Sequence, residues 1–181
     1  MLPLSSKNLA PTSAMTRILL SLLGALTFVN ASESIPNELI DYAQFLQIAR
    51  KVEAIRKERR LSETQFIEMS KEPGTLVLDA RSADKYALRH ITGAISLPFT
   101  DFTAPALEKV IPAKTTRLLI YCNNNFLGNP TAFASKSAPA SLNISTYIAL
   151  ATYGYTNIYE LGPLLEIKTT QISFEGKEVG K

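Results

Sequence analysis

Residues 118–126 read Leu-Leu-Ile-Tyr-Cys-Asn-Asn-Asn-Phe and contain the single cysteine of the 181-residue chain. The apolar run 118–121 predicts a strand buried on both faces, as in a parallel sheet covered by helices. Cys122 would then lie at the carboxyl end of that strand, where α/β sheets bind ligands. A thiol at this position is a candidate nucleophile. A lone cysteine is also commonly a buried structural residue, and this stretch by itself leaves both interpretations open.

Strand and helix patterns alternate around this stretch, which predicts an α/β fold with a parallel sheet flanked by helices. Ser62 with Gln65 three residues later has the pattern of a capping box, and Ser82 is a second N-cap candidate. Gly154 is a candidate for the C′ position, directly after the end of a helix. Strands are predicted at 76–79, 95–98, 118–122 and 155–161, with a short one at 171–174; helices are predicted at 62–69, 83–88, 101–110 and from a start between 137 and 143 to 154.

An amphipathic helix is predicted to precede this domain, over residues 38–60. Its apolar residues recur at three- and four-residue intervals and its carboxyl end is basic, which complements the helix dipole. We favour a helix packed on the domain with a solvated charged face over a docking surface for an anionic lipid or partner. The apolar positions are Leu39, Tyr42, Phe45, Leu46, Ala49, Val52 and Ile55.

The N-terminal residues 1–31 have the pattern of a secretory signal. Arg17 precedes an apolar run from Ile18 to Val29 that is short for a membrane span, and Ala31 completes a small-x-small cleavage pattern. Met15 is the expected start, with residues 1–14 as an upstream extension. We expect export to a bacterial periplasm, with no stable membrane span after cleavage; the alternative is an anchor formed by an uncleaved segment. The predicted division is 1–31, a helical segment 32–60, a domain 61–167 and a polar tail 168–181.

Charge and composition exclude several kinds of site. The chain has 19 Lys and Arg against 16 Asp and Glu, and loss of residues 1–31 removes only Lys7 and Arg17, leaving 17 against 16. No nucleic-acid partner is therefore expected. One cysteine cannot form an internal disulfide, so export would leave a free thiol. The sole histidine, His90, argues against a multi-histidine metal site, and no metal or cofactor is expected.

Five separated patterns, in order, resemble the rhodanese-like domain family of single-domain sulfurtransferases. The likeness covers about residues 61–161. The matching segments are Leu76-Val77-Leu78-Asp79-Ala80-Arg81, Tyr86, His90-Ile91-Thr92-Gly93-Ala94-Ile95 with Leu97-Pro98, Leu119-Ile120-Tyr121-Cys122, and Gly154-Tyr155-Thr156-Asn157-Ile158-Tyr159.

The resemblance implies a sulfurtransferase-type site. Cys122 would take up a sulfane sulfur from a small donor such as thiosulfate, as a persulfide, and pass it to a thiol acceptor. Backbone N–H groups and the next helix N-terminus would favour the thiolate. Expected substrate-binding or loop residues are Asn123, Asn124, Asn125, Phe126 and Lys136, and expected structural supports are Asp79, Arg81 and His90.

The loop after Cys122 departs from the family pattern. Active members usually have about six residues before the helix, often with Arg or Lys, whereas about fifteen or more are predicted here. Lys136 is the only cation of this loop, and Arg117 is the last arginine of the chain. Cysteine phosphatases need a cysteine and an arginine in one phosphate-binding loop, so that activity is excluded. An alternative function is therefore a catalytically inactive binding module that uses this loop to contact another envelope protein.

Overall fold

The structure, a computed structural model, describes residues 35–180. The predicted signal segment 1–31, including Met15, lies outside the described residues. Residues from Asn37 onward form one compact unit. None of the helices in the described part of the chain is both long and apolar enough to span a bilayer.

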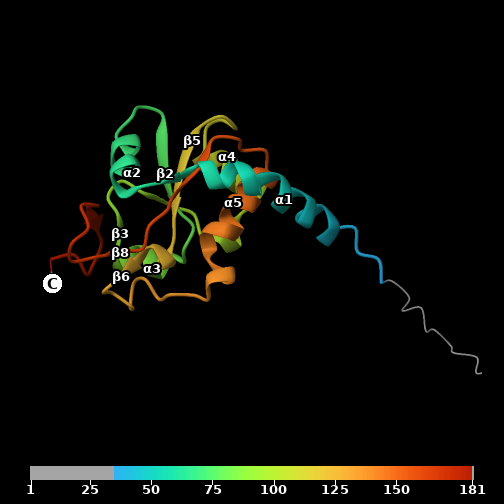
Figure 1. Cartoon of the computed structure of the whole chain (residues 1–181). Coiled ribbons are helices and arrows are strands. Elements are labelled where there is room, and N and C mark those ends of the chain that lie inside the picture. Colours follow the sequence, from blue (N-terminus) through green and yellow to red (C-terminus); the bar gives the residue numbers. More distant parts are fainter. Residues whose placement is uncertain (1–34, 181) are drawn as a thin grey trace, which may run out of the picture. The chain divides into compact units, whose positions relative to one another are not determined.

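Five parallel strands form the central sheet in the order β1-β7-β5-β2-β4 (Figure 1). All four pairings are parallel, which confirms the predicted fold class. The strand that precedes Cys122, β5, is the middle strand of the five. The strands are β1 (Arg60–Leu61), β2 (Thr75–Asp79), β4 (Ile95–Ser96), β5 (Arg117–Tyr121) and β7 (Ile158–Leu161).

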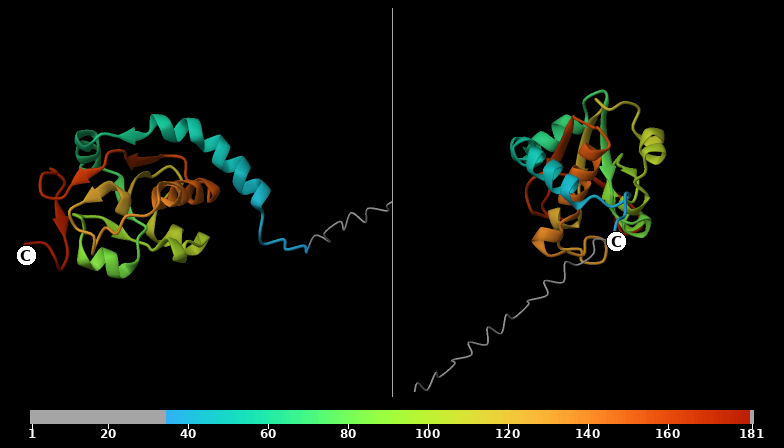
Figure 2. Two further views of the ribbon diagram at one scale, coloured as in Figure 1. Left: turned by 60° about the horizontal axis from the view of Figure 1, so that its bottom comes forward. Right: turned by 90° about the vertical axis from the view of Figure 1, so that its right-hand side faces the viewer.

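Helices cover both faces of the sheet (Figure 2). Alternate residues of β5 enter opposite cores: Leu118 and Ile120 pack with residues of α1, α4 and α5, while Leu119 and Tyr121 pack with Phe66 of α2 and with the loop after β5. This two-sided burial explains the continuous apolar run of β5. The helices are α1 (Tyr42–Glu58), α2 (Glu63–Ser70), α3 (Ala83–Leu88), α4 (Ala104–Val110) and α5 (Leu142–Thr152); single 3-10 turns are η1 (Phe99–Asp101), η2 (Asn123–Asn125) and η3 (Ala138–Ala140).

Local sequence signals explain several helix ends. Ser62 and Gln65 form the predicted capping box at the start of α2. Gly154 follows α5 with a φ of 86°, a left-handed conformation that glycine adopts without strain. Ser82 is the N-cap residue of α3, as predicted, although its side chain makes no capping hydrogen bond. The start of α4 was wrong in detail: the helix begins after Thr103, whose hydroxyl accepts from Ala106 N–H, instead of at Asp101.

The helix α1 is packed on the domain from about Ile48 onward. Val52 is buried, and Ile48 and Ala49 pack against the core beside α5. The predicted apolar positions Tyr42 and Phe45 are exposed instead, because the first turns of the helix extend past the sheet layers (Figure 2). The amphipathic period is therefore correct, but it marks a buried face only where the domain lies underneath.

Two small pairs of strands bring the chain after β7 back onto the domain. Antiparallel pairing joins β3 (His90–Ile91) to β9 (Phe174–Glu175), and parallel pairing joins β6 (Phe126–Leu127) to β8 (Leu165–Glu166). Ile172 is buried in the second core. The polar C-terminal segment thus packs on the domain, with its strand displaced toward the C-terminus from the predicted 171–174.

Candidate active site

Cys122 directly follows the middle strand β5 and is 1% exposed. The backbone N–H of Asn125 donates to the carbonyl oxygen of Cys122 at 3.1 Å, which closes a one-turn 3-10 helix directly after the cysteine. The Sγ of Cys122 lies 3.4 Å from Oγ of Ser141. Ser141 is the N-cap residue of α5, yet its hydroxyl makes no capping hydrogen bond. The thiol therefore lies between a one-turn 3-10 helix and the N-terminus of α5, with a hydroxyl group beside it.

A cavity of about 300 Å³ adjoins the thiol. Cys122, Asn125, Ser141 and Asn143 line it from the Cys122 loop and α5. Oδ1 of Asn143, a residue 5% exposed, has no hydrogen-bond partner within the described residues. A buried acceptor without a partner is costly, so this atom offers a hydrogen-bonding position to a molecule that enters the cavity.

Asn125 holds the turn around Cys122 in shape. Its Oδ1 accepts from Cys122 N–H at 2.9 Å and from Nδ2 of Asn143 at 3.1 Å. Its Nδ2 donates to the carbonyls of Leu161 and Pro163. One side chain thus ties the Cys122 turn to α5 and to the end of β7, which fixes the position of the thiol relative to the cavity.

The other two asparagines fasten the long loop. Asn123 Nδ2 donates to the carbonyl of Ala134, and Asn124 pairs with the backbone of Lys136 in both directions, at 2.8 and 2.9 Å. Both side chains replace backbone partners in the manner of a strand pair. The 20 residues 122–141 that separate β5 from α5 are therefore folded back on the Cys122 turn.

Three of the predicted loop residues lie away from the cavity that adjoins Cys122, and one of them, Asn123, lines a neighbouring cavity instead. Phe126 is fully buried among Tyr121, Phe133 and Phe174. Lys136 lines a different cavity, of about 470 Å³, together with Arg81. The structure thus brings Asn124 and Asn125 to the Cys122 cavity but places neither the aromatic ring nor the lysine there.

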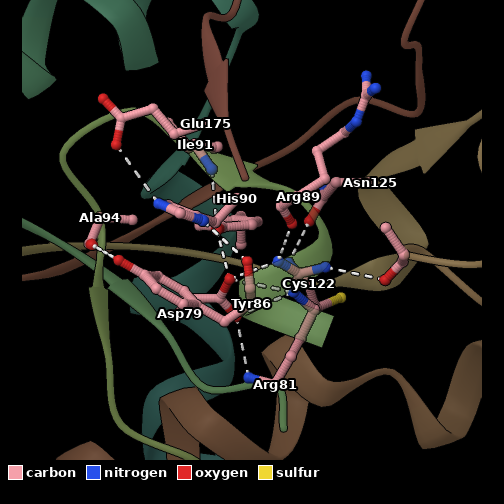
Figure 3. Close-up of polar contacts among 12 residues, drawn as sticks. Asp79, Arg81, Tyr86, Arg89, His90, Ile91, Ala94, Cys122, Asn125 and Glu175 are labelled. Atoms are coloured by element: carbon pink, nitrogen blue, oxygen red, sulfur yellow. Dashed lines mark hydrogen bonds and ion pairs between the residues drawn. The ribbon is translucent and has the colours of Figure 1, made fainter. Parts of the chain in front are cut away.

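Asp79 and Arg81 form a closed cluster at the end of β2 (Figure 3). Arg81 Nη2 lies 2.5 Å from Oδ2 of Asp79, and the hydroxyl of Tyr121 donates to the same oxygen. The remaining guanidinium donors reach the carbonyls of Ala132 and Arg89. Arg81 also lies over the ring of Phe133, with 4.3 Å from Cζ to the ring centroid.

The charge pair sets the ionisation of this cluster. Burial lowers the pKa of Arg81, but the hydrogen bond and charge of Asp79 outweigh it, so the pKa is raised. Burial, reinforced by the Asp79 charge, raises the pKa of Tyr121 well above its usual value. Arg81 therefore remains charged and Tyr121 neutral, and neither group is available for proton transfer near neutral pH.

His90, like Asp79 and Arg81, has a structural role beside the site. Its Nδ1 lies 2.8 Å from the carbonyl oxygen of Tyr86, and its ring stacks on the Tyr86 ring with centroids 3.7 Å apart. Nε2 lies 3.5 Å from a carboxylate oxygen of Glu175 on β9 (Figure 3). His90 thus ties the C-terminal segment to the domain and does not line the Cys122 cavity.

Three charged residues of the cavity escaped the sequence interpretation: Arg56, Arg60 and Glu160. Glu160 is 1% exposed on β7, and Nη2 of Arg56 donates to its Oε2 at 2.9 Å. Arg60 Nε lies 3.2 Å from Oε1. Burial raises the pKa of Glu160, and the charges of Arg56 and Arg60 partly oppose this rise. A signal was present: a carboxylate within a buried strand needs a cation, and the end of α1 has the densest group of arginines in the chain.

Comparison with known proteins agrees with this architecture. The family model described as "Rhodanese-like domain" matches residues 62–162. The BH2092 protein from Bacillus halodurans has a similar structure, with a TM-score of 0.50 and 19% identity over 74% of this chain and 88% of that chain. A search of the curated proteins finds no relative of this chain.

Two further solved structures are similar at lower scores. The rhodanese-like domain of the Alr3790 protein from Anabaena has a TM-score of 0.47 and 20% identity, over 68% of this chain and 83% of that chain. A thiosulfate sulfurtransferase from Pseudomonas aeruginosa has a TM-score of 0.49 and 19% identity, over 73% of this chain and 23% of that chain. These similarities concern the arrangement of strands and helices.

Proposed function

Because this chain belongs to the rhodanese-like domain family, we propose that it transfers sulfane sulfur through a persulfide on Cys122. The substrates are a small sulfane-sulfur donor, of which thiosulfate is the simplest, and a thiol that accepts the sulfur. The observation that carries this proposal is the place of the thiol: it follows the middle strand of a parallel sheet, faces the N-terminus of α5 and adjoins a cavity of about 300 Å³.

The proposed reaction has two displacement steps. After the thiol has lost its proton to water, the Cys122 thiolate attacks the outer sulfur of thiosulfate. A new S–S bond forms on Cys122, the S–S bond of the donor breaks, and sulfite leaves with the electron pair. An acceptor thiolate then attacks the outer sulfur of the persulfide, takes it as its own persulfide and releases the Cys122 thiolate. No external oxidant or reductant is needed.

Residues around the thiol support these steps by position. The thiol lies beside Ser141, the N-cap residue of α5, so the positive end of the α5 dipole would stabilise negative charge on Sγ. The hydroxyl of Ser141, 3.4 Å away, can donate to the same sulfur or to the outer sulfur of the persulfide. The cavity is large enough for a donor of a few heavy atoms and encloses it among polar groups.

Intact-mass measurement tests the proposal. The reduced protein is incubated with thiosulfate, and one added sulfur atom is expected, removable by a thiol. The Cys122→Ser variant should gain none, and a Ser145→Ala variant on α5, outside the cavity lining, serves as a matched control that should gain it. If folded, reduced protein remains unmodified with several sulfane donors, sulfur transfer is rejected.

A second candidate function is a binding module without catalysis, favoured by the near-complete burial of Cys122. The partner would be another envelope protein that contacts the exposed loop segment around Lys136. Deleting the loop cannot test this, because Phe126 and Phe133 belong to the core. Lys136→Glu, at an exposed position, should abolish function in a complementation assay while Cys122→Ser preserves it; the reverse result rejects the module.

Export of the protein is part of the same proposal. It is supported by the basic and apolar pattern of residues 15–31. Amino-terminal sequencing of the protein from a cell envelope fraction should find a start at Ser32. An intact N-terminus on protein recovered with membranes would instead favour the anchored alternative.

A further inference from the structure

The cationic groups of the Cys122 cavity come from outside the matched family domain. Arg56 lies on α1 and Arg60 on β1, and both precede residue 62, at which the family match begins. The long loop supplies one cation, Lys136, which lines a different cavity. The positive charges that line the Cys122 cavity are therefore two guanidinium groups of the preceding segment, and none comes from the loop.

Strand pairing holds these arginines beside the thiol. β1 adds to the sheet next to β7, with Arg60 opposite Glu160, and β7 lies next to β5 with Glu160 opposite Ile120. Arg60 Nη2 also donates to the carbonyl of Gly162 at 2.8 Å. The end of α1 is thus fixed near the carboxyl end of β5, two residues from Cys122.

The cluster of Arg56, Arg60 and Glu160 has more positive than negative charge. Two guanidinium groups face one carboxylate, so the cavity has a net charge of one positive unit at neutral pH. Arg56 Nε is buried and has no hydrogen-bond partner in the described chain. The Arg60 side chain is 53% exposed, which leaves it free to contact a solute. Glu160 by itself needs one arginine, and the second is surplus to that need.

We propose that Arg56 and Arg60 bind the anionic group of the sulfur donor whose outer sulfur reaches Cys122. The donor class is a small sulfur oxyanion, thiosulfate or an organic thiosulfonate, because the planar guanidinium donors match paired oxyanion oxygens. The same contacts stabilise the sulfite or sulfinate that leaves with the electron pair. This inference rests on the proposed function, since it uses the same thiol, and adds that the preceding helix completes the site.

A purely structural ion pair makes a different prediction. If the arginines only anchored α1, their removal would affect folding and would change the rate of reaction with every donor by the same factor. Charges that bind the donor would act on anionic donors alone and would be weakened by salt, because Arg60 is half exposed. Donor charge is therefore the variable that separates the two roles.

The test compares thiosulfate with the uncharged donor dimethyl trisulfide. Rates of Cys122 modification are followed by intact mass for the parent, Arg60→Gln and Arg60→Lys, with Arg50→Gln as the matched control. Thiosulfate adds one sulfur atom and releases sulfite, whereas dimethyl trisulfide leaves a mixed methyl disulfide or trisulfide on Cys122 and releases methyl persulfide or methanethiolate. Arg50 is an exposed cation of α1, the helix that carries Arg56, and it lies outside the lining of the Cys122 cavity. Arg60→Gln should slow thiosulfate by about fivefold to tenfold, the effect of one charged hydrogen bond at a half-exposed site. Arg60→Lys should recover part of this rate.

The remaining measurements keep the outcome decisive. Arg60→Gln should leave the dimethyl trisulfide rate within about twofold, and Arg50→Gln should leave both rates unchanged. In the parent, added salt should slow thiosulfate more than the uncharged donor. Equal effects of Arg60→Gln on both donors, or none on either, overturn the arginine assignment while sulfur transfer stands. If neither donor modifies the parent, the proposed function itself fails.

Discussion

Two arginine–carboxylate clusters flank the cysteine strand. Asp79 ends β2 on one side of β5, and Glu160 lies near the end of β7 on the other side. Both carboxylates are buried and both face arginine. In the Asp79 cluster, the carboxylate accepts from Arg81 backbone and side chain and from Tyr121. Glu160 accepts one hydrogen bond, from Arg56, and has only an ion contact with Arg60.

Both clusters consist of a carboxylate and arginine, so residue type does not distinguish a structural pair from a candidate binding pair. The number of hydrogen bonds satisfied within the protein does. In the Asp79 network every nitrogen of the Arg81 guanidinium has an acceptor within the protein, and such a network rigidifies its surroundings. The Glu160 cluster opens on the Cys122 cavity and contains polar atoms without partners among the described residues. Three variants test the comparison.

The largest effect is expected for Asp79→Ala. It leaves Arg81, which is 3% exposed, without its counter-charge. A loss of about 3–5 kcal/mol in the free energy of unfolding is expected, as for other buried pairs broken on one side. Urea denaturation measures it. The control Glu72→Ala breaks the exposed pair with Arg117 and should cost below about 1 kcal/mol; similar losses in both variants would contradict the contrast.

A smaller effect is expected for Tyr121→Phe. The hydroxyl donates to Asp79 and accepts from the buried N–H of Ile91 at 3.1 Å. Its removal leaves that N–H without a partner, which costs about 1–3 kcal/mol. Tyr153→Phe, which removes a single partly buried bond to the Phe102 carbonyl, is the control for chemical denaturation. An equal or smaller loss at Tyr121 would show that the Asp79 network is not saturated in solution.

The smallest effect is expected for Glu160→Gln. Burial raises the pKa of Glu160 despite Arg56 and Arg60, and Tyr147 is the other titratable group that interacts with it. Relative to the unfolded chain, the folded protein therefore favours the protonated carboxyl of Glu160. The stability that this contributes is fully present below the pKa of Glu160 in the unfolded chain, and it is lost as the pH rises through the pKa of Glu160 in the folded protein.

The neutral glutamine removes that cost. The Glu160→Gln protein should be as stable as the parent at pH 7, or more stable by up to about 1 kcal/mol, with the difference vanishing toward acidic pH. Thermal unfolding at several pH values measures this. A clear loss of stability at neutral pH would make the Glu160 cluster equivalent to that of Asp79 and remove the distinction between the two.

Much of the fold followed from local patterns, because strand and helix periods and caps depend on near neighbours in the chain. The strand 118–121 and the capping box of Ser62 are examples. The exposure of Tyr42 and Phe45 could not be predicted, because the helix period identifies an apolar face but not how far the domain beneath it extends. The core positions of Phe126 and Phe133, inside an apparent loop, depend on contacts with the distant Phe174.

For the candidate site, the sequence by itself determined the fold, the buried strand 118–121 and the cysteine at its end, since these follow from hydrophobic period and from the order of short patterns. Only the tertiary structure decided which charges accompany Cys122. Parallel strands join residues far apart in sequence, so Arg60 meets Glu160 across β1 and β7. The single lysine of the loop after Cys122 therefore says little about the charge of the cavity, because Arg56 of α1 and Arg60 of β1, which precede the matched domain, contribute its cations.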